Sequence, residues 1–390
     1  MEGLHADVVI VGGGAMGCSL AYHLMNDGFA GEVLVVERDP LRERNSTALS
    51  AGGIRQQFGT AVNIRLSRYS VDFYEHWHER TEVEGESTPI NFRQRGYLFL
   101  ADAGNATVLA RRAALQRSLG VEVEELTPGQ VHDLVPDLDV SRLQGANFGR
   151  RDGYLDPYSV MKGFEAKARQ LGAHFLVAEA AQLLQQQGRV TGLRLTDGRS
   201  IKASVVVDAA GAWAAELAAS AGLSLPIAPQ RHSVYVARSG RWPELSLPMT
   251  ICPSGLYFRE EQPGYVLVGK SQPDDPVAFD FGVDRRRFEE LWFELAEWMP
   301  VFDQLRLEHA WSGLYEMNTA DANAIIGEQP ELRGFYVIAG FSGHGMMQAP
   351  GAGKALSELI RLGRYETVDL RELSPERFAT GRLVVEDAVI

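Results

Sequence analysis

The chain contains little cysteine, no block of basic residues and no long apolar run. Its two cysteines, Cys18 and Cys252, are too few for a disulfide framework or a four-thiolate metal site. Lys and Arg number 38 against 51 Asp and Glu, and the resulting net charge of −13 argues against nucleic acid or an anionic membrane as a partner. No apolar run reaches the roughly 18 residues of a membrane span. The first residues, MEGLHADVV, lack the basic start and apolar stretch of a secretory signal, so we expect a soluble, cytoplasmic protein.

Two reaction classes have no motif to support them. The patterns H-E-x-x-H, C-x-x-C and G-x-S-x-G do not occur, which leaves zinc and serine-hydrolase chemistry without support and predicts no metal site. With 390 residues, 45% of them hydrophobic, the chain is long enough for two or three domains. We therefore expect an enzyme or a binding protein whose chemistry lies in other patterns.

A glycine-rich turn follows the first apolar run. Residues 8–17 read VVIVGGGAMG and lead into a helix-like stretch, so Gly12, Gly14 and Gly17 form G-x-G-x-x-G between a strand and a helix. Glycines here permit a tight turn, bring backbone N–H groups against a pyrophosphate and let the helix pack closely on the strand. Glu37 ends the next apolar run about 20 residues later, where an acid binds ribose hydroxyls and repels a 2′-phosphate. The pattern predicts a βαβ unit that binds a dinucleotide other than NADP.

A second turn of the same plan lies near the other end of the chain. Residues 335–354 read FYVIAGFSGHGMMQAPGAGK, an apolar run, a Gly/Ser/His turn and a stretch that can be helical from Met346 onward. The positive end of such a helix would point into the turn. His344 in this turn is either an acid–base catalyst or a structural residue. Two such turns predict one site closed by both ends of the chain and favour FAD, although an NAD-dependent dehydrogenase fits the first turn alone.

Two further segments are candidates for a site. The sequence STALSAGGIR at residues 46–55 places small residues where the chain can pass beside a flat ligand. Arg55 at its end can bind a carboxylate with two hydrogen bonds, or it can form an ordinary surface ion pair. The sequence VVVDAAGAW at residues 205–213 puts Gly211 in another turn after a strand, a pattern that is more often a packed turn than a site.

The middle of the chain changes character. The α/β pattern returns at residues 173–177, 190–195 and 205–208. Strand-like runs rich in aromatic or β-branched residues occupy residues 91–101, 231–238, 255–261, 264–270 and 309–318, and helices are predicted over residues 63–78 and 284–299. We expect two interleaved domains: an FAD-binding, Rossmann-like α/β domain of residues 1–85, 145–225 and 328–390, and a substrate domain with a mixed or antiparallel sheet of residues 86–144 and 226–327.

These segments, in this order, resemble the FAD-dependent amine and amino-acid oxidoreductases related to D-amino acid oxidase. That group includes sarcosine oxidase, glycine oxidase, the β subunits of sarcosine oxidase and dye-linked L-proline dehydrogenase, and the mitochondrial FAD-dependent oxidoreductase domain-containing proteins. The resemblance spans nearly the whole chain. It is carried by STALSAGGIRQQF at residues 46–58, RGYLFLA at 95–101, DGYLDP at 152–157 and AGFSGHGMMQAPGAGK at 339–354.

The resemblance implies roles for individual residues. It implies FAD contacts at Gly12, Gly14, Gly17, Glu37, Arg38, Ser46, Thr47, Ala181, Gly211, Ser342, Gly343, His344, Gly345 and Met346. Within this set, Ala181 would meet the adenine, and residues 342–346 would lie over the pyrimidine edge of the flavin. Arg55 falls on an arginine that binds the substrate carboxylate. Tyr257 and Tyr315 fall on two active-site tyrosines that would enclose the amine, and His344 completes the candidate catalytic set.

Four positions depart from the sarcosine oxidase pattern. Gly313 stands near the cysteine that tethers the flavin there, so we expect non-covalent FAD. Leu267 stands in place of a lysine that activates oxygen, which favours a dehydrogenase over an oxidase, although glycine oxidase also has an apolar residue there. Met347 replaces a second carboxylate-binding lysine, and Ser271 replaces an active-site histidine.

The sequence therefore predicts FAD-dependent oxidation of a small secondary-amine amino acid, such as proline, sarcosine or another N-alkyl amino acid, to its imine by hydride transfer. The electron acceptor would be oxygen, a quinone, a dye or a partner flavoprotein, and the chain could be one subunit of a hetero-oligomer. Two alternatives remain open: a non-catalytic flavoprotein that acts as a subunit or assembly factor, and a glycine-type oxidase of primary amino acids.

Overall fold

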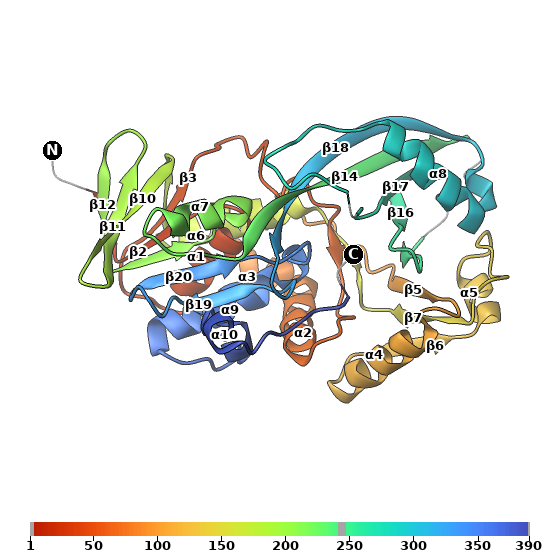
Figure 1. Ribbon diagram of the computed structural model, residues 1–390, viewed down its shortest axis with the longest axis horizontal. Helices are drawn as coiled ribbons and strands as arrows, with labels where there is room; N and C mark the ends of the chain where they lie inside the picture. The colour runs from red at the N-terminus through yellow and green to blue at the C-terminus, as the bar shows by residue number, and fades with distance from the viewer. Residues whose placement is uncertain (1–3, 241–246, 273, 389–390) are drawn as a thin grey trace.

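The computed structural model describes residues 4–240, 247–272 and 274–388. They form two halves that lie side by side, each built on a β-sheet (Figure 1). The first half contains a six-stranded sheet in the order β19-β20-β13-β2-β3-β9. All neighbours in it are parallel except the edge pair β19/β20. Its strands are β2 (Val8–Val11), β3 (Val33–Glu37), β9 (His174–Val177), β13 (Val205–Asp208), β19 (Ile325–Glu328) and β20 (Phe335–Ala339).

The central strands are almost continuous runs of Val and Ile because layers cover both faces of this sheet. On one face α1 packs between α6 and α9, and α2 packs on α9. The other face is covered by α7 and by a small sheet in the order β1-β12-β11-β10. These elements are α1 (Ala15–Asn26), α2 (Ala61–Glu75), α6 (Pro157–Gln170), α7 (Ala214–Ala219), α9 (Ala349–Leu362), β1 (Leu4–His5), β10 (Ala180–Gln186), β11 (Arg189–Leu195) and β12 (Ser200–Lys202).

The parallel register brings the two glycine turns together. β13 lies between β2 and β20, and its residue Val207 is level with Ile10 on one side and Tyr336 on the other. The carboxyl ends of parallel strands meet at one edge of a sheet, so the turns that follow β2 and β20 lie on either side of β13. This edge is where open α/β sheets bind their ligands.

The second half is built on an eight-stranded sheet in the order β18-β14-β17-β16-β15-β5-β7-β6. Its pairs are antiparallel except for β15/β5. The strands are β5 (Tyr97–Ala101), β6 (Val123–Leu126), β7 (Gly145–Gly149), β14 (Ile227–Ser239), β15 (Met249–Ile251), β16 (Tyr257–Gln262), β17 (Tyr265–Gly269) and β18 (Leu305–Asn318). The long strands β14 and β18 form the edge that reaches toward the first half (Figure 1).

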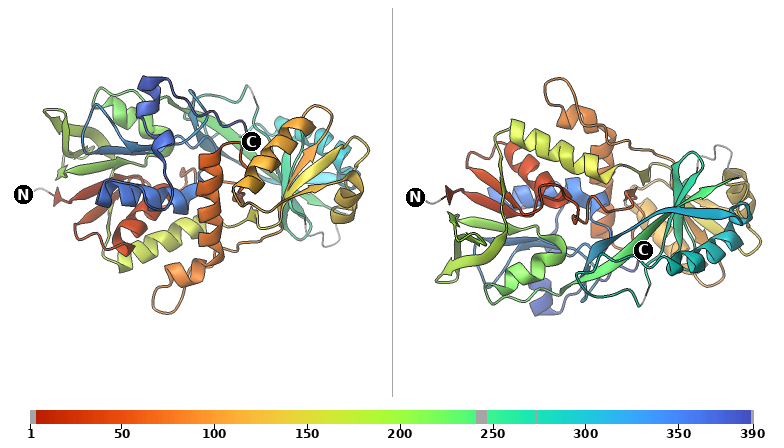
Figure 2. Two further views of the ribbon diagram at one scale, coloured as in Figure 1. Left: turned by 90° about the horizontal axis from the view of Figure 1, so that it is seen from below. Right: turned by 90° about the horizontal axis from the view of Figure 1, so that it is seen from above.

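Helices cover the two faces of this second sheet differently. α8 (Arg286–Trp298) and α5 (Pro128–Leu134) bury their apolar sides against one face. α4 (Ala106–Ser118) packs against β5, β6 and β7 and also contacts α2, and Figure 2 shows the gold α4 and the teal α8 flanking the sheet. The remaining part of the other face carries Tyr257, Leu267 and Met249, which look toward the first half. A two-stranded ribbon of β4 (Gly53–Ile54) and β8 (Gly153–Tyr154) connects the halves.

The expected architecture, a parallel α/β unit joined to a largely antiparallel sheet, is confirmed, with corrections in detail. The helix predicted over residues 63–78 divides at His76 into α2 and α3 (Trp77–Thr81). The predicted strand 91–101 is regular only in β5. The helix expected from Met346 begins with a 3₁₀ turn (Met346–Gln348) and becomes α-helical at Ala349.

Strand pairing also shifts two expected domain boundaries. β7 hydrogen-bonds to β5 and β6, so the boundary at residue 145 is wrong, because residues 145–149 belong to the eight-stranded sheet. β19 hydrogen-bonds to β20, so residues 325–327 belong with the six-stranded sheet rather than with the substrate domain. The division into two functional domains itself stays a prediction. In the described part of the chain no helix is long and apolar enough to cross a membrane.

Candidate active site

A groove made of three adjoining pockets runs from the first glycine turn to Arg55. The pockets have volumes of about 280, 90 and 50 Å³. The first and second share Ala15, Met16, Ser46, Thr47 and Glu316 as walls, and the second and third share Ser50, Ala51, Tyr315, Gly343 and Met346. Because neighbouring pockets share walls, the groove can hold one long ligand with a small second molecule at its inner end.

The first glycine turn requires glycine for steric reasons. Gly12 has φ 107°, and a Cβ there would lie 2.3 Å from the carbonyl oxygen of Ala209. A Cβ on Gly17 would lie 1.9 Å from the carbonyl oxygen of Gly12, so the helix could not pack on the turn. Gly14 is the N-cap of α1 and has no side chain to cap the helix, which leaves this helix end open toward the first pocket.

Glu37 is fixed at the wall of the first pocket. Its carboxylate accepts hydrogen bonds from the backbone N–H of Gly13 at 2.7 Å and of Asp39 at 2.8 Å. It also pairs with Arg42 at 3.0 Å. Arg38 stacks over the Trp213 ring at 4.0 Å on the same wall. The acid expected to meet ribose hydroxyls is therefore held in place by the turn itself.

The second glycine turn is braced against β18. The backbone N–H of Asn318 donates to the Ser342 hydroxyl at 2.9 Å, and the Ser342 N–H donates to the Glu316 carbonyl at 3.2 Å. Gly343 has φ 91°, and a Cβ there would lie 2.6 Å from the Tyr315 ring. The Ser342 side chain thus supports the turn, while Gly343 and Gly345 face the second pocket.

Two carboxyl groups beside the groove, the buried Asp208 and the half-buried Glu316, were not predicted from the sequence. Burial raises the pKa of Glu316 to about 7, against the hydrogen bonds from the backbone of Gly340 and Phe341. Burial also raises the pKa of Asp208 to about 8, and the negative charge of Glu316 adds to this effect. Glu316 lines the first and second pockets, so it lies at the middle of the groove.

Arg55 is buried at the inner end of the groove, where it lines the third pocket. Its Nη1 donates to the carbonyl of Gln57 and its Nη2 to the carbonyl of Ala388. The Phe58 ring lies 4.0 Å below the guanidinium carbon. Its Nε has no hydrogen-bond partner within residues 4–240, 247–272 and 274–388. The expectation of a surface ion pair is wrong, because this guanidinium is buried and donates to backbone carbonyls.

The DGYLDP segment holds the backbone that carries Arg55. Asp152 is fully buried, and its carboxylate accepts hydrogen bonds from the backbone N–H and side-chain amide of Gln56, each at 3.0 Å. It accepts a third from the side chain of Gln57 at 3.2 Å. Burial raises the pKa of Asp152 to about 6, partly offset by these hydrogen bonds and by the charge of Arg55.

The two predicted tyrosines are joined by a histidine that the sequence reading missed. Nε2 of His232 lies 2.8 Å from the Tyr257 hydroxyl, and its ring stacks on Tyr315 with centroids 4.5 Å apart. Its Nδ1 lies 3.4 Å from the hydroxyl of Ser271, a surface residue. Burial lowers the pKa of His232 to about 4, so the imidazole is neutral at neutral pH. A period-2 reading of residues 231–238 would have placed His232 on the same face as Val234, which lines the second pocket.

His344 is buried beside Arg55 and lines the third pocket. Neither ring nitrogen has a hydrogen-bond partner in the described chain. Burial lowers its pKa to about 4, although the nearby charge of Glu386 acts in the opposite direction. The side chain is therefore a neutral imidazole whose two ring nitrogens are enclosed without a hydrogen-bond partner among the described residues.

The groove brings together all but one of the sequence-predicted site residues. Those lining the first pocket are Gly12, Gly14, Glu37, Arg38, Ser46, Thr47, Ala181 and Gly211. Those lining the second or third pocket are Arg55, Tyr257, Tyr315, Ser342, Gly343, His344, Gly345 and Met346. Gly17 is the exception, because it serves the packing of α1 on the turn. Thr47 also has a structural task, since its hydroxyl accepts from the Ala15 N–H at 3.0 Å.

The positions that depart from the sarcosine oxidase pattern are also placed. Gly313 lines the second pocket and Met347 the third. Leu267 lies on the same sheet face as Tyr257, yet it does not line any of the three pockets. No lysine lines them either, and neither cysteine does. No group of three or more His, Cys, Asp or Glu placed to hold a metal ion occurs among the described residues.

Comparison with known proteins agrees with this geometry. The family model of FAD dependent oxidoreductases (DAO) matches residues 7–359. FAD-dependent oxidoreductase domain-containing protein 1 of Xenopus laevis is 34% identical, over 99% of this chain and 85% of that protein. L-proline dehydrogenase from P. horikoshii is similar with a TM-score of 0.89 and 29% identity, over 98% of this chain and 100% of that one. Glycine oxidase from Geobacillus kaustophilus has a TM-score of 0.83 and 26% identity, over 95% and 98% of the two chains. This chain therefore belongs to the DAO family of FAD-dependent oxidoreductases.

Proposed function

We propose that the protein oxidises a small secondary-amine amino acid, such as proline, sarcosine or another N-alkyl amino acid, to its imine. The observation that carries the proposal is the third pocket, a small space that the buried Arg55 lines together with Tyr257 and Tyr315. A pocket of about 50 Å³ suits a small substrate, and Arg55 suits a carboxylate. The similarity to an L-proline dehydrogenase over nearly the whole chain supports a secondary amine.

The residues of the groove fit FAD. The open end of α1 and the close backbone approach at Gly12 suit the pyrophosphate, and Glu37 suits the ribose hydroxyls. The second turn, with Gly343 and Gly345 bare against the second pocket, suits the flat ring system. When bound, FAD supplies the acceptor for the hydride that leaves the substrate α-carbon. We infer non-covalent binding, because neither cysteine lines the groove and Gly313 has no side chain to form a bond.

Arg55 would fix the substrate by its carboxylate. A guanidinium has five N–H donors, and the carbonyls of Gln57 and Ala388 take one on each Nη. Each Nη therefore keeps one further N–H that can donate to a carboxylate. The methionines Met249 and Met347, together with Tyr97, form the less polar walls around the rest of a small side chain.

The substrate amine must lose a proton before its α-hydrogen can leave as hydride. Tyr257 lines the third pocket, His232 follows at 2.8 Å, and Ser271 follows at 3.4 Å on the surface. We infer that this chain of groups carries the amine proton outward. His232 suits the task because burial keeps its imidazole neutral, so it can accept a proton from the Tyr257 hydroxyl as that hydroxyl takes one from the amine.

The proposed enzyme is a dehydrogenase rather than an oxidase, because Leu267 replaces the expected oxygen-activating lysine and no lysine lines the groove. Its acceptor would then be a quinone, a dye or a partner flavoprotein rather than oxygen. Association with other subunits and a cytoplasmic location stay predictions.

The decisive experiment is anaerobic mixing of the purified yellow protein with proline, sarcosine, N-methylated amino acids and glycine, followed by absorbance of the flavin. We expect bleaching by one or more secondary amines, and then faster reoxidation by a dye than by air. Bleaching by glycine alone would favour the primary-amine alternative. A flavin that no member of the panel bleaches would contradict the proposal and favour a non-catalytic flavoprotein.

A further inference from the structure

The last part of the described chain reaches the substrate end of the groove. After α9 come a 3₁₀ turn (Arg371–Leu373), α10 (Glu376–Thr380) and an extended stretch to residue 388. In Figure 1 this dark blue stretch leaves α10 and crosses to the middle of the molecule, between the two halves. The family match ends at residue 359, so this segment lies outside the region that the family model matches.

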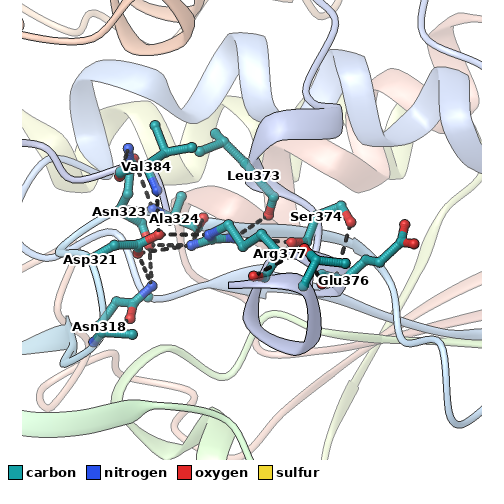
Figure 3. Close-up of polar contacts among 12 residues, drawn as sticks. Asn318, Asp321, Asn323, Ala324, Leu373, Ser374, Glu376, Arg377 and Val384 are labelled. Atoms are coloured by element: carbon teal, nitrogen blue, oxygen red, sulfur yellow. Dashed lines mark hydrogen bonds and ion pairs between the residues drawn. The ribbon is translucent and has the colours of Figure 1, made fainter. Parts of the chain in front are cut away.

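A buried ion pair anchors the segment at α10. Arg377 is 4% exposed, and its Nε and Nη2 donate to the Asp321 carboxylate at 2.7 and 3.1 Å (Figure 3). The Asp321 carboxylate also accepts from the Val384 N–H at 3.1 Å and from the Asn318 side chain at 2.8 Å. Since Asn318 also holds Ser342, one network fixes both the segment and the second glycine turn.

A second anchor lies at Glu386, next to the site. Its carboxylate accepts from the backbone N–H of Gly59 at 2.8 Å, from the N–H and hydroxyl of Thr60 at 3.1 and 2.8 Å, and from the Asn63 side chain at 2.9 Å. These groups form the start of α2, whose N-cap Thr60 makes no capping hydrogen bond through its own side chain. Burial acts to raise the pKa of Glu386, but the hydrogen bonds from Asn63, Gly59 and Thr60 outweigh it and lower that pKa. Glu386 is thus a fixed anion at the positive end of a helix.

From this anchor the chain turns inward to Arg55. The Ala388 N–H donates to the Glu386 carboxylate at 2.9 Å, and the Ala388 carbonyl accepts from Nη2 of Arg55. On the other side, Nη1 donates to the Gln57 carbonyl. Two carbonyls on different segments therefore hold the two Nη groups, and the donor without a partner is Nε. Such contacts behind a binding group lock its rotamer and reduce the cost of binding.

We propose that residues 384–388 are a positioning element for Arg55, holding its guanidinium at the wall of the third pocket, where it meets the carboxylate of the substrate. The proposal rests on the proposed function, because it assumes that Arg55 binds that carboxylate. It makes Glu386 a specificity-determining residue that acts through Ala388 and Arg55 without touching the substrate. A purely structural segment would instead affect stability alone.

The test measures binding of a carboxylate probe to the FAD-loaded protein. The probe is pyrrole-2-carboxylate, followed by the change in flavin absorbance, and pyrrole serves as the matched probe without a carboxylate. The variants are Glu386→Ala, Arg55→Ala and the double variant, with Glu376→Ala as the control, because Glu376 is an exposed acid in the same segment. Flavin content and melting temperature are recorded for each variant.

We expect Glu386→Ala to weaken the binding of pyrrole-2-carboxylate about tenfold and the binding of pyrrole hardly at all. A tenfold loss is the size expected when part of a charge-assisted contact is lost. In the Arg55→Ala background the same change should have no further effect, since the segment acts through Arg55. Equal affinities for the Glu386→Ala and Glu376→Ala variants would overturn the inference. An Arg55→Ala variant that binds the probe as well as the unchanged protein would instead refute the carboxylate site itself.

A milder variant keeps the test usable if Glu386→Ala does not fold. Thr60→Val removes one hydrogen bond to Glu386 and leaves the segment and Arg55 unchanged. Thr60→Val should weaken the binding of the carboxylate probe about two- to threefold, the effect of one modest hydrogen bond. This loss should appear only in proteins that keep Arg55. Unchanged affinity in a normally folded Thr60→Val protein would overturn the inference.

Discussion

Nε2 of His232 lies 2.8 Å from the hydroxyl oxygen of Tyr257, and this contact joins the middle of β14 to the start of β16. The same imidazole stacks on Tyr315 from β18 at an interplanar angle of 11°. One histidine therefore sets the positions of both phenols at the inner end of the groove. The side of the imidazole away from Tyr257 meets the surface hydroxyl of Ser271.

Replacing His232 by Leu should slow flavin reduction more at low pH than at high pH. At pH 7 a secondary amine arrives protonated, and loss of the outward path should reduce the rate about 100-fold, the lower end of the usual contribution of one acid–base group. At pH 10 more of the amine arrives neutral, so the deficit should shrink. Anaerobic stopped-flow measurements at both values test this. His309→Leu, an exposed histidine on β18, is the control. An equal deficit at both pH values would rule out a role in proton transfer.

Replacing Arg55 by Lys should raise KM at least about tenfold with a smaller change in kcat. Lysine keeps the charge, yet it cannot donate to the Gln57 and Ala388 carbonyls and still bind a carboxylate through two parallel hydrogen bonds. Steady-state kinetics with the preferred amino acid measure both constants. Arg95→Lys, an exposed arginine outside the groove, should leave both unchanged. A normal KM for the Arg55→Lys enzyme would show that no bidentate contact is made.

The parts of the site that follow strands could be predicted from the sequence. Gly12 and Gly343 stand out because a turn after an apolar run has a local pattern, and the parallel order of β2, β13 and β20 then brings both turns together. His232 could not be linked to Tyr257 without knowing the register of a long antiparallel sheet. Ala388 is 333 residues from its partner Arg55, and nothing local in the sequence marks a carbonyl as a ligand of a distant arginine.

The raised pKa values of two carboxyl groups could not be predicted from the sequence either. Asp208 and Glu316 lie at the ends of apolar runs, where a sequence pattern predicts a solvent-facing end. Only the packing of β13 and β18 shows that loss of solvent raises the pKa of both carboxyls, and that the charge of Glu316 raises the pKa of Asp208 further. The expected divisions at residues 145 and 328 failed for a similar reason, because strand partners are set by contacts that a linear reading does not contain.

Replacing Gly12 by Ala should abolish FAD uptake. A Cβ at this position would meet the Ala209 carbonyl oxygen at 2.3 Å, and φ 107° is unfavourable for any L side chain. The turn would have to move and withdraw its N–H groups from the pyrophosphate. Titration of the FAD-free protein with FAD, followed by fluorescence, measures the affinity. Gly129→Ala, where nothing lies within 4 Å, should bind FAD normally. Normal affinity in the Gly12→Ala protein would place the cofactor elsewhere.

Replacing Asp208 by Asn should stabilise the protein increasingly as the pH rises. Burial raises the pKa of Asp208 to about 8, above its value of about 3.9 in an unfolded chain. Between these two pKa values the folded state binds more protons than the unfolded state. The contribution of Asp208 to the free energy of unfolding is therefore complete below about pH 4 and is lost as the pH rises through about 8. Asn keeps the acceptor for the Ala210 N–H and cannot ionise. The melting temperature of the variant relative to the original should increase by a few degrees between pH 6 and pH 9.

The pH dependence of the melting temperature distinguishes Asp208 from the other titratable groups near the groove. His232, with its pKa lowered to about 4 by burial, changes stability in the opposite direction and only between about pH 4 and 6.5, below most of that window. Glu316 is present in both proteins, so its own titration largely cancels in the difference between them. Asp137→Asn, an exposed aspartate, should shift the melting temperature little at any pH. A melting difference between the Asp208→Asn protein and the original that is the same at pH 6 and pH 9 would contradict a pKa of about 8 for Asp208.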